Sequence, residues 1–253
     1  MNINWNAEGY ASDFSFVPGY GENVMELLTA PAGSLAADFG CGNGTLTAKL
    51  REKGYTVTGV DASEEMLSLA EKNHPELKLM KGDITEITLP EPVDVIFSNA
   101  VFHWIEPDRQ DALARNIYRN LKPGGELVFE MGGKDCAETV HGSMEKIFVR
   151  RGLSYRRLKY FPSVSEYTTI LERNGLRVTY AIWFERPTPQ KGDDGAVEWA
   201  KMFDAANYEG LDQKLKDELF SELREVTRPK LCTPEGKWWI DYTRLRIRAV
   251  RPV

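Results

Sequence analysis

The sequence predicts an α/β protein: a Rossmann-like, doubly wound sheet, mostly parallel and seven-stranded, with helices on both faces and a helical cap. Short apolar runs alternate with segments of helical period, which is the pattern of strands joined by crossover helices. Several of these runs end at an acidic residue or an asparagine. A glycine-rich turn also joins the first apolar run to a helical segment, as a tight strand-to-helix connection requires.

Composition narrows the class of protein. The 253 residues carry a net charge of −6, which argues against nucleic acid or an anionic membrane as the main partner. We expect neither a membrane span nor a signal peptide, because the apolar runs stay short. The 3 cysteines and 3 histidines lack paired spacing, so we expect no disulfide framework and no metal site. A cytoplasmic protein, monomeric or weakly dimeric, is the resulting expectation.

The first half of the chain contains the clearest strand and helix signals. The opening strand begins at Leu35, and Leu46–Arg51 reads as the helix after the glycine turn. Ser63 is placed to cap the helix that follows it, and a further helix is expected from about Asp108 to Leu121. The remaining strands of this half are expected at Thr56–Asp61, Leu77–Met80, Val93–Phe97 and Glu126–Met131.

The second half keeps the alternation but with longer helical stretches. We interpret the chain as one domain, 1–253, with an aromatic flap and helix over 1–30 and a ligand-binding core over 34–133. Helical insertions that form the cap are expected over 134–165 and 187–237. The last two strands are expected over 176–185 and 239–250.

Acidic residues at the strand ends indicate the kind of ligand. A nicotinamide turn reads Gly-x-Gly-x-x-Gly, but here the third glycine of Gly40, Gly42 and Gly44 comes one residue early. Asp38 would repel a pyrophosphate but suits an ammonium group, through water. Asp61 would accept both hydroxyls of a ribose. Asp83 would accept an adenine amino group. Met66 and Ile84 would enclose the ring, so we predict S-adenosylmethionine, with S-adenosylhomocysteine as the product.

Five motifs in chain order resemble those of class I S-adenosylmethionine-dependent methyltransferases. They are 38–44 (DFGCGNG), 59–63 (GVDAS), 82–84 (GDI), 98–100 (SNA) and 121–125 (LKPGG). The resemblance is firm over about 35–131 and implies further cofactor contacts from Tyr10, Ala62 and Asn99. Segments 5–10 and 99–104 look like the trans-aconitate methyltransferase-like branch, which methylates small carboxylic acids. His103 stands where that branch has glutamine, so the substrate stays open.

Methyl transfer from a sulfonium is an in-line displacement, so alignment and exclusion of water are the main tasks. A carboxylate acceptor is already ionised at neutral pH and needs no general base, whereas a hydroxyl or amine would use His103 as the base. His103 and Trp104 are therefore the candidate catalytic residues. The candidate groups for holding an acceptor carboxylate are Arg156, Arg157, Tyr242 and Arg244.

We therefore predict O-methylation of a small-molecule carboxylate. Two alternatives remain at this point. One is a non-enzymatic sensor that binds the same cofactor and a partner protein through its cap. The other is a nicotinamide-dependent oxidoreductase on the same kind of sheet, against which the glycine spacing and Asp38 both speak.

Overall fold

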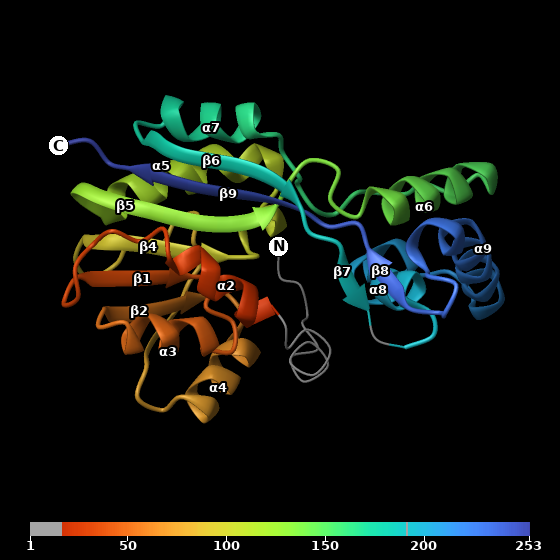
Figure 1. Cartoon of the computed structure of the whole chain (residues 1–253), viewed down its shortest axis with the longest axis horizontal. Coiled ribbons are helices and arrows are strands. Elements are labelled where there is room, and N and C mark those ends of the chain that lie inside the picture. The colour runs from red at the N-terminus through yellow and green to blue at the C-terminus, as the bar shows by residue number, and fades with distance from the viewer. Residues whose placement is uncertain (1–16, 191) are drawn as a thin grey trace. The chain divides into compact units, whose positions relative to one another are not determined.

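The computed structural model of the protein describes residues 17–190 and 192–253 (Figure 1). Tyr10 and the rest of the predicted aromatic flap up to residue 16 lie outside this part of the chain. The elements up to residue 132 are α2 (Val17–Met25), β1 (Leu35–Phe39), α3 (Thr45–Glu52), β2 (Thr56–Asp61), α4 (Glu64–Asn73), β3 (Lys78–Lys81), β4 (Val93–Asn99), the 3-10 turns η1 (Phe102–Trp104) and η2 (Pro107–Arg109), α5 (Gln110–Asn120) and β5 (Leu121–Gly132). After them come α6 (Glu138–Arg150), α7 (Val164–Arg173), β6 (Arg177–Glu185), β7 (Thr188–Gln190), α8 (Gly195–Phe203), η3 (Ala205–Tyr208), α9 (Gln213–Leu231), β8 (Trp238–Ile240) and β9 (Thr243–Val250).

The main sheet has seven strands in the order β3-β2-β1-β4-β5-β9-β6. The pairs β1/β2, β1/β4, β2/β3 and β4/β5 are parallel. Strand β9 runs antiparallel to β5, because Gly124 N donates to Arg251 O at 2.8 Å while Gly133 N donates to Thr243 O at 3.2 Å. The predicted mostly parallel, seven-stranded sheet is confirmed. Its order reverses between β1 and β4, where open α/β sheets bind ligands beyond the carboxyl ends of their strands.

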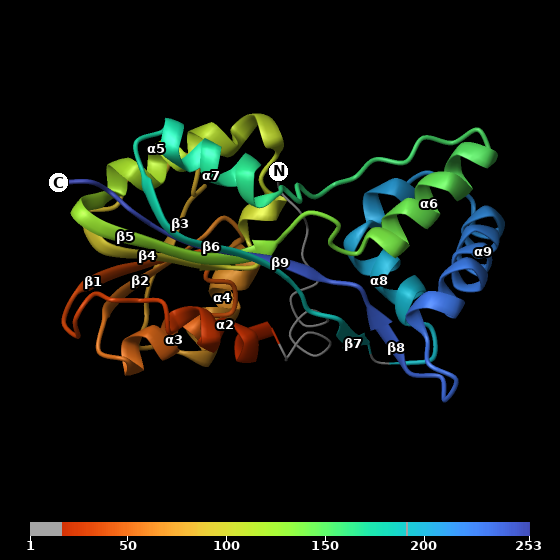
Figure 2. The same cartoon turned by 45° about the horizontal axis from the view of Figure 1, so that its top comes forward.

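Helices cover both faces of this sheet, as expected. Figure 2 shows α2, α3 and α4 below it and α5 and α7 above it. The strands at its centre are apolar on both faces, which is typical of parallel strands buried between two helical layers. In β1, for example, Ala36, Ala37 and Phe39 are each at most 1% exposed.

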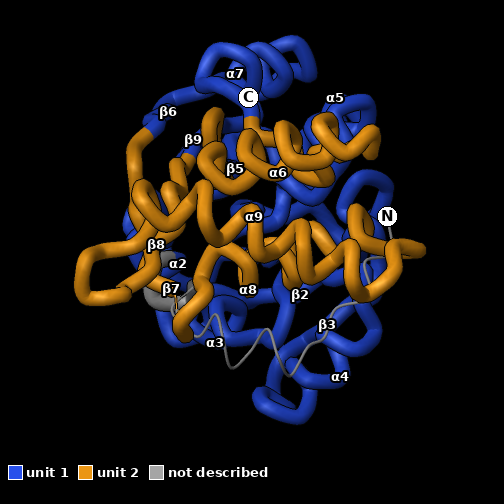
Figure 3. Tube along the Cα trace, turned by 90° about the vertical axis from the view of Figure 1, so that its right-hand side faces the viewer, with its two compact units in different colours: residues 1–131, 162–183, 245–253 blue, residues 132–161, 184–244 orange. Residues whose placement is uncertain are grey.

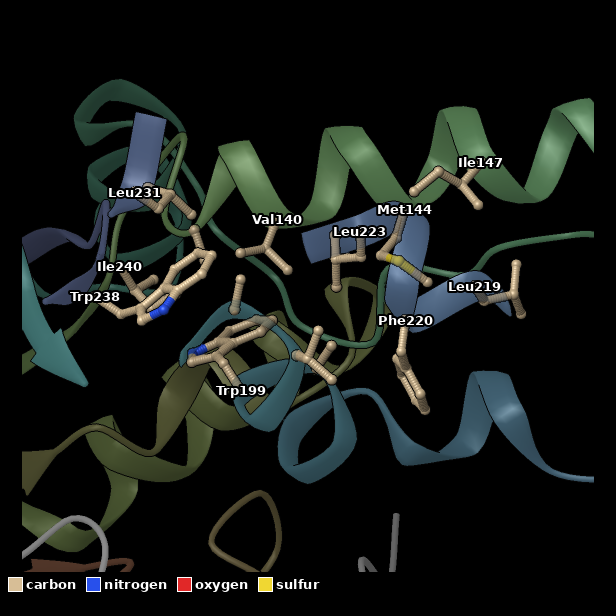
Figure 4. Close-up of a cluster of buried hydrophobic side chains, with 14 of the residues drawn as sticks. Val140, Met144, Ile147, Trp199, Leu219, Phe220, Leu223, Leu231, Trp238 and Ile240 are labelled. Carbon is tan, nitrogen blue, oxygen red and sulfur yellow. The ribbon is translucent and has the colours of Figure 1, made fainter. Parts of the chain in front are cut away.

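The chain divides into two compact units (Figure 3). The first contains residues 1–131, 162–183 and 245–253, and the second contains 132–161 and 184–244. The second unit has a hydrophobic core of its own, most of which α6, α8, α9 and β8 supply; Figure 4 shows part of its side chains. Trp199 and Trp238 are its largest members, and both are at most 2% exposed. No helix in the described part of the chain combines the length and the apolarity needed to cross a membrane.

The last predicted strand, 239–250, is wrong as one element. It is divided into β8, which pairs with β7 in a separate two-stranded sheet, and β9, which joins the main sheet. The break lies at Asp241, whose carbonyl accepts from Ala137 N at 3.1 Å and whose carboxylate accepts from Thr139 N at 2.9 Å. The alternating pattern runs through the break, so periodicity alone could not reveal it.

The segment 122–125 also differs from expectation. The sequence predicts a helix to about Leu121 and a strand only from Glu126; α5 does end at Asn120, but the segment between them already belongs to β5. Val93 pairs with Leu121 and Val95 with Glu126, so the residues between form a bulge in the strand. Gly124, with a φ of 82°, permits it.

Candidate cofactor site

A pocket of about 170 Å³ opens at the carboxyl ends of β1, β2 and β4 within the first compact unit. It lies at the edge where the sheet order reverses. It is lined by Gly40, Gly42, Asp61, Ala62, Met66, Gly82, Asp83, Ile84, Asn99, Ala100, Val101, Trp104, Ile105, Glu106 and Arg109.

The glycine turn forms the floor of this pocket between β1 and α3. Gly40 has a φ of 78°, and a Cβ there would lie 2.3 Å from Val101 Cγ2, so no larger residue fits. Gly44 precedes α3 with a φ of 82°, but a Cβ on it would lie 3.1 Å from Leu77 Cδ1. It therefore allows the turn to pack closely on neighbouring side chains and does not line the pocket, unlike Gly40 and Gly42.

Asp61 ends β2 and ties two loops of the site together. Its Oδ2 accepts from Gly42 N and its Oδ1 accepts from Ser63 N, each at 2.9 Å. Burial raises the pKa of this carboxyl, and the amide donors oppose the rise. Ser63 also caps α4, as predicted, because its Oγ accepts from Met66 N at 3.2 Å. Each carboxylate oxygen keeps acceptor capacity for a ligand hydroxyl.

Asp83 follows β3 and is held from two sides. Its Oδ1 accepts from Thr85 N at 2.9 Å and from Thr85 Oγ1 at 2.7 Å. Its Oδ2 accepts from Arg109 at 2.9 Å. Burial raises the pKa of Asp83, but the Thr85 and Arg109 donors outweigh it and the net pKa is lowered. The carboxylate therefore stays ionised at the pocket.

Asp38 does not line the pocket. Its carboxylate is only 2% exposed and accepts from the Thr47 hydroxyl at 2.7 Å. Burial raises its pKa to about 7; the Thr47 bond opposes this and the charge of Asp61 adds to it. The predicted contact with an ammonium group stays a prediction. Burial likewise raises the pKa of the Cys41 thiol, which suits a small spacer and not a nucleophile.

The chain after β4 forms the opposite wall. Ala100 has a φ of 62°, an unfavourable backbone conformation for a residue with a Cβ, and its N–H donates to Glu130 O at 2.8 Å. This bend directs Val101 and Trp104 to the pocket. His103 is 7% exposed and is not among the lining residues; its ring centroid lies 5.4 Å from that of Trp104. Of the two candidate catalytic residues, Trp104 alone lines the pocket.

The residues present fit S-adenosylmethionine. The glycine turn gives room that a Cβ would fill, and the carboxylates of Asp61 and Asp83, which keep acceptor capacity, both line the pocket. The buried side chains of Met66 and Ile84 both reach it, as predicted for the walls around an adenine ring. Of the predicted cofactor set, the structure brings together Gly40, Gly42, Asp61, Ala62, Met66, Asp83, Ile84 and Asn99.

Sequence reasoning missed Glu106 and Arg109. Both come from the η1–η2 segment, which has no strand or long helix to announce its position. The motif around Asn99 identified the start of this wall. Its continuation through two 3-10 turns leaves no periodicity that could have located Arg109 opposite Asp83.

The predicted acceptor-binding residues all belong to the second compact unit, where they fall into two groups. Tyr242 is buried, its hydroxyl accepts from Trp199 Nε1 at 2.5 Å, and the guanidinium of Arg244 lies 4.7 Å from its ring centroid. Arg157 is paired with Glu138 and Glu145 on an exposed surface, and the side chain of Arg156 is exposed. Tyr242 and Arg244 are therefore the pair that the structure brings together.

The second unit also contains a buried polar chain that the sequence did not indicate. Tyr155 donates to Asp204 Oδ2 at 2.6 Å, and Lys159 donates to Asp204 Oδ1 at 2.8 Å. Because the Tyr155 proton is used, His141 Nδ1, at 2.7 Å from that hydroxyl, is the donor of their bond. Burial lowers the pKa of His141 to about 4, so its ring is neutral at pH 7.

The comparisons with known proteins agree with this geometry. The family model described as a methyltransferase domain matches residues 37–129, which hold the glycine turn and all the residues that line the pocket. An uncharacterised methyltransferase of Schizosaccharomyces pombe is 30% identical over 97% of both chains. An uncharacterised methyltransferase of Geobacillus sp. is 29% identical over 69% of this chain and 84% of its own.

Solved structures show the same fold. A candidate methyltransferase of Bacillus halodurans C-125 superposes with a TM-score of 0.64 at 16% identity, over 93% of this chain and 100% of that one. Haemonchus contortus phosphoethanolamine N-methyltransferase 2, solved with phosphomonomethylethanolamine and S-adenosylhomocysteine, gives 0.57 at 20% identity, over 93% of this chain and 53% of that one. The fold, the site and the relatives together assign the chain to the class I S-adenosylmethionine-dependent methyltransferase family.

Proposed function

We propose that this methyltransferase binds S-adenosylmethionine in the pocket at the carboxyl ends of β1, β2 and β4 and methylates a carboxylate oxygen of a small molecule. When bound, the cofactor supplies an electrophilic methyl group on a sulfonium for in-line displacement. The observation that carries the proposal is that Asp61 and Asp83 line one pocket together with the apolar side chains of Met66 and Ile84. This arrangement suits a ribose, an adenine and a cationic centre together.

The chain's own residues have separate tasks in this proposal. Asp61 accepts from the ribose hydroxyls while it holds the glycine turn in place through Gly42 N. Asp83 accepts from the adenine amino group, and Met66 and Ile84 cover the ring. Trp104 excludes water from the wall it lines. Alignment of this kind can contribute ~7–11 kcal/mol to lowering a barrier.

A carboxylate acceptor is supported by the cationic and hydroxyl groups of the second unit. Arg244 is 8% exposed and stacks on Tyr242, so its planar fork has little rotational freedom. A fixed guanidinium suits bidentate binding of a carboxylate better than the exposed side chains of Arg156 and Arg157. A carboxylate also needs no base, and His103 does not line the cofactor pocket. Because the sequence resembles the trans-aconitate methyltransferase-like branch, small carboxylic acids are the acceptors to test first.

The experiment combines the purified protein, S-adenosylmethionine with an isotopically labelled methyl group, and a panel of small mono-, di- and tricarboxylic acids that includes trans-aconitate. Labelled products are identified by mass spectrometry and then treated with mild base. A methyl ester is hydrolysed by base, whereas a methyl ether or a methylated amine is not. We expect a base-labile labelled product, reduced at least tenfold in Arg244→Gln.

Two results would contradict parts of this proposal. A labelled product that resists base would show that the methyl acceptor is a hydroxyl or amine and not a carboxylate. Such an acceptor requires a general base, so His103→Gln would be the next variant to test. Binding of S-adenosylhomocysteine without any methylation of a complete metabolite extract would favour the sensor alternative.

A further inference from the structure

We propose that Arg109 is a positioning residue for adenine recognition: it holds the Asp83 carboxylate so that one defined oxygen receives the amino group of the cofactor. The inference rests on the proposed function, since it takes Asp83 to be the adenine-binding carboxylate. No motif in the chain includes Arg109. It reaches the site from η2, a separate segment from the loop after β3 that carries Asp83.

The distribution of hydrogen bonds singles out one oxygen. Asp83 Oδ1 accepts from both the N–H and the hydroxyl of Thr85, which uses its two lone pairs. Asp83 Oδ2 accepts from Arg109 alone among the contacts of the described residues, at 2.9 Å. One acceptor direction therefore stays available on Oδ2. An amino donor in the pocket would share that oxygen with Arg109.

Arg109 also bonds the hydroxyl of Thr85 with the same terminal nitrogen. A single guanidinium nitrogen thus fixes both the carboxylate and the threonine that braces it. Without Arg109, the Asp83 carboxylate would rotate at a lower cost in free energy, and its two oxygens could then exchange places. The side chains of Arg109 and Asp83 are 34% and 32% exposed, so the ion pair adds little to overall stability and its removal should leave the fold intact.

The charge of Arg109 acts in the same direction. Burial raises the pKa of Asp83, while the donors from Thr85 and Arg109 lower it further than burial raises it. A carboxylate that stays ionised accepts from an amino group and repels a carbonyl oxygen. The pair therefore discriminates between an amino group and a carbonyl at position 6 of the purine.

The test compares two ligands by isothermal titration calorimetry: S-adenosylhomocysteine and S-inosylhomocysteine, which carries a carbonyl in place of the adenine amino group. We expect the wild-type protein to prefer the adenosyl compound at least about tenfold, as a hydrogen bond to a charged acceptor implies. In Arg109→Met this preference should fall at least about threefold. Arg109→Lys, which keeps a cation, should retain most of it.

Arg173→Met is the matched control, because it removes another arginine–aspartate pair of the first unit, with Asp111, which does not line the pocket. Its ligand preference should equal that of the wild type. Thermal unfolding followed by circular dichroism checks that each variant is folded; if Arg109→Met is not, Arg109→Gln takes its place.

An equal loss of affinity for both ligands in Arg109→Met would mean that Arg109 only supports the loop, and the inference would be wrong. A wild-type protein that binds both ligands equally would overturn it by removing Asp83 from adenine recognition. A wild-type protein that binds neither ligand would instead contradict the proposed cofactor site.

Discussion

Asp38 provides a sharp test of the electrostatics beneath the cofactor site. Its carboxyl is 2% exposed, and burial raises its pKa from the ordinary 3.8 to about 7. Between these two values the unfolded chain has released this proton and the native protein still holds it. The free energy of unfolding therefore falls as pH rises through this window, by about 1.4 kcal/mol for each pH unit. The whole window amounts to about 4 kcal/mol.

The substitution Asp38→Asn removes this titration and keeps an oxygen that can accept from the Thr47 hydroxyl. Urea unfolding of both proteins at several pH values measures the effect. The stability of the variant relative to the wild type should rise by about 3 kcal/mol between pH 5 and pH 8. A rise below about 1 kcal/mol would refute the claim that burial dominates the pKa of Asp38.

Asp94→Asn is the control with the opposite sign. Burial raises the pKa of Asp94, but donors from Lys122 and the Leu35 N–H outweigh it, so the net pKa is lowered. Such a group contributes stability above its unfolded pKa that is lost as pH falls through the folded pKa. Removal of its charge should therefore cost stability at neutral pH, and this cost should fade in acid. If the stability of both variants relative to the wild type changed with pH in the same direction, the cause would be a global effect of pH and not the two local environments.

Three further substitutions test other links between structure and function. Asp61→Ala should weaken S-adenosylhomocysteine binding at least about a hundredfold by calorimetry with the circular dichroism spectrum unchanged; retained micromolar binding would contradict the ribose assignment. Ala100→Val should lower the unfolding free energy by about 1–2 kcal/mol and Ala100→Gly should not, since only the latter accepts a φ of 62° without strain. Lys159→Met should cost about 3–5 kcal/mol by removing the cation that pairs with the buried Asp204 carboxylate, and the double variant Lys159→Met, Asp204→Leu should recover part of this in urea unfolding.

The parts of the fold that could be predicted are those where a short sequence pattern also determines where its residues lie in the folded sheet. Apolar runs ending in Asp61 and Asn99 mark strands whose carboxyl ends share one edge, because parallel strands joined by helices must point the same way. The glycine turn was informative for the same reason. Glycine is required at position 40 because a Cβ there would lie 2.3 Å from Val101 Cγ2, in the segment that forms the opposite wall, so this glycine reports directly on the site.

Other features depend on contacts between distant segments, which carry no local signal. The break between β8 and β9 follows from two hydrogen bonds to Asp241 from the start of α6, more than a hundred residues earlier. The buried chain that joins His141, Tyr155 and Asp204 likewise combines three segments of the second unit. A sequence pattern shows that each of these residues is polar, but not that the fold removes it from water.

This difference explains why the methyl donor is easier to identify than the acceptor. The donor site is built from residues at the ends of successive strands, and the topology of the sheet dictates their common edge. The second unit has no such rule: Tyr242 and Arg244 adjoin one another because β9 begins there, while Arg157 is drawn into ion pairs with α6. Packing of the second unit determines which of its cationic side chains stay buried and fixed in orientation. Arg244 is such a side chain, so variants of Arg244 are the first test of acceptor specificity.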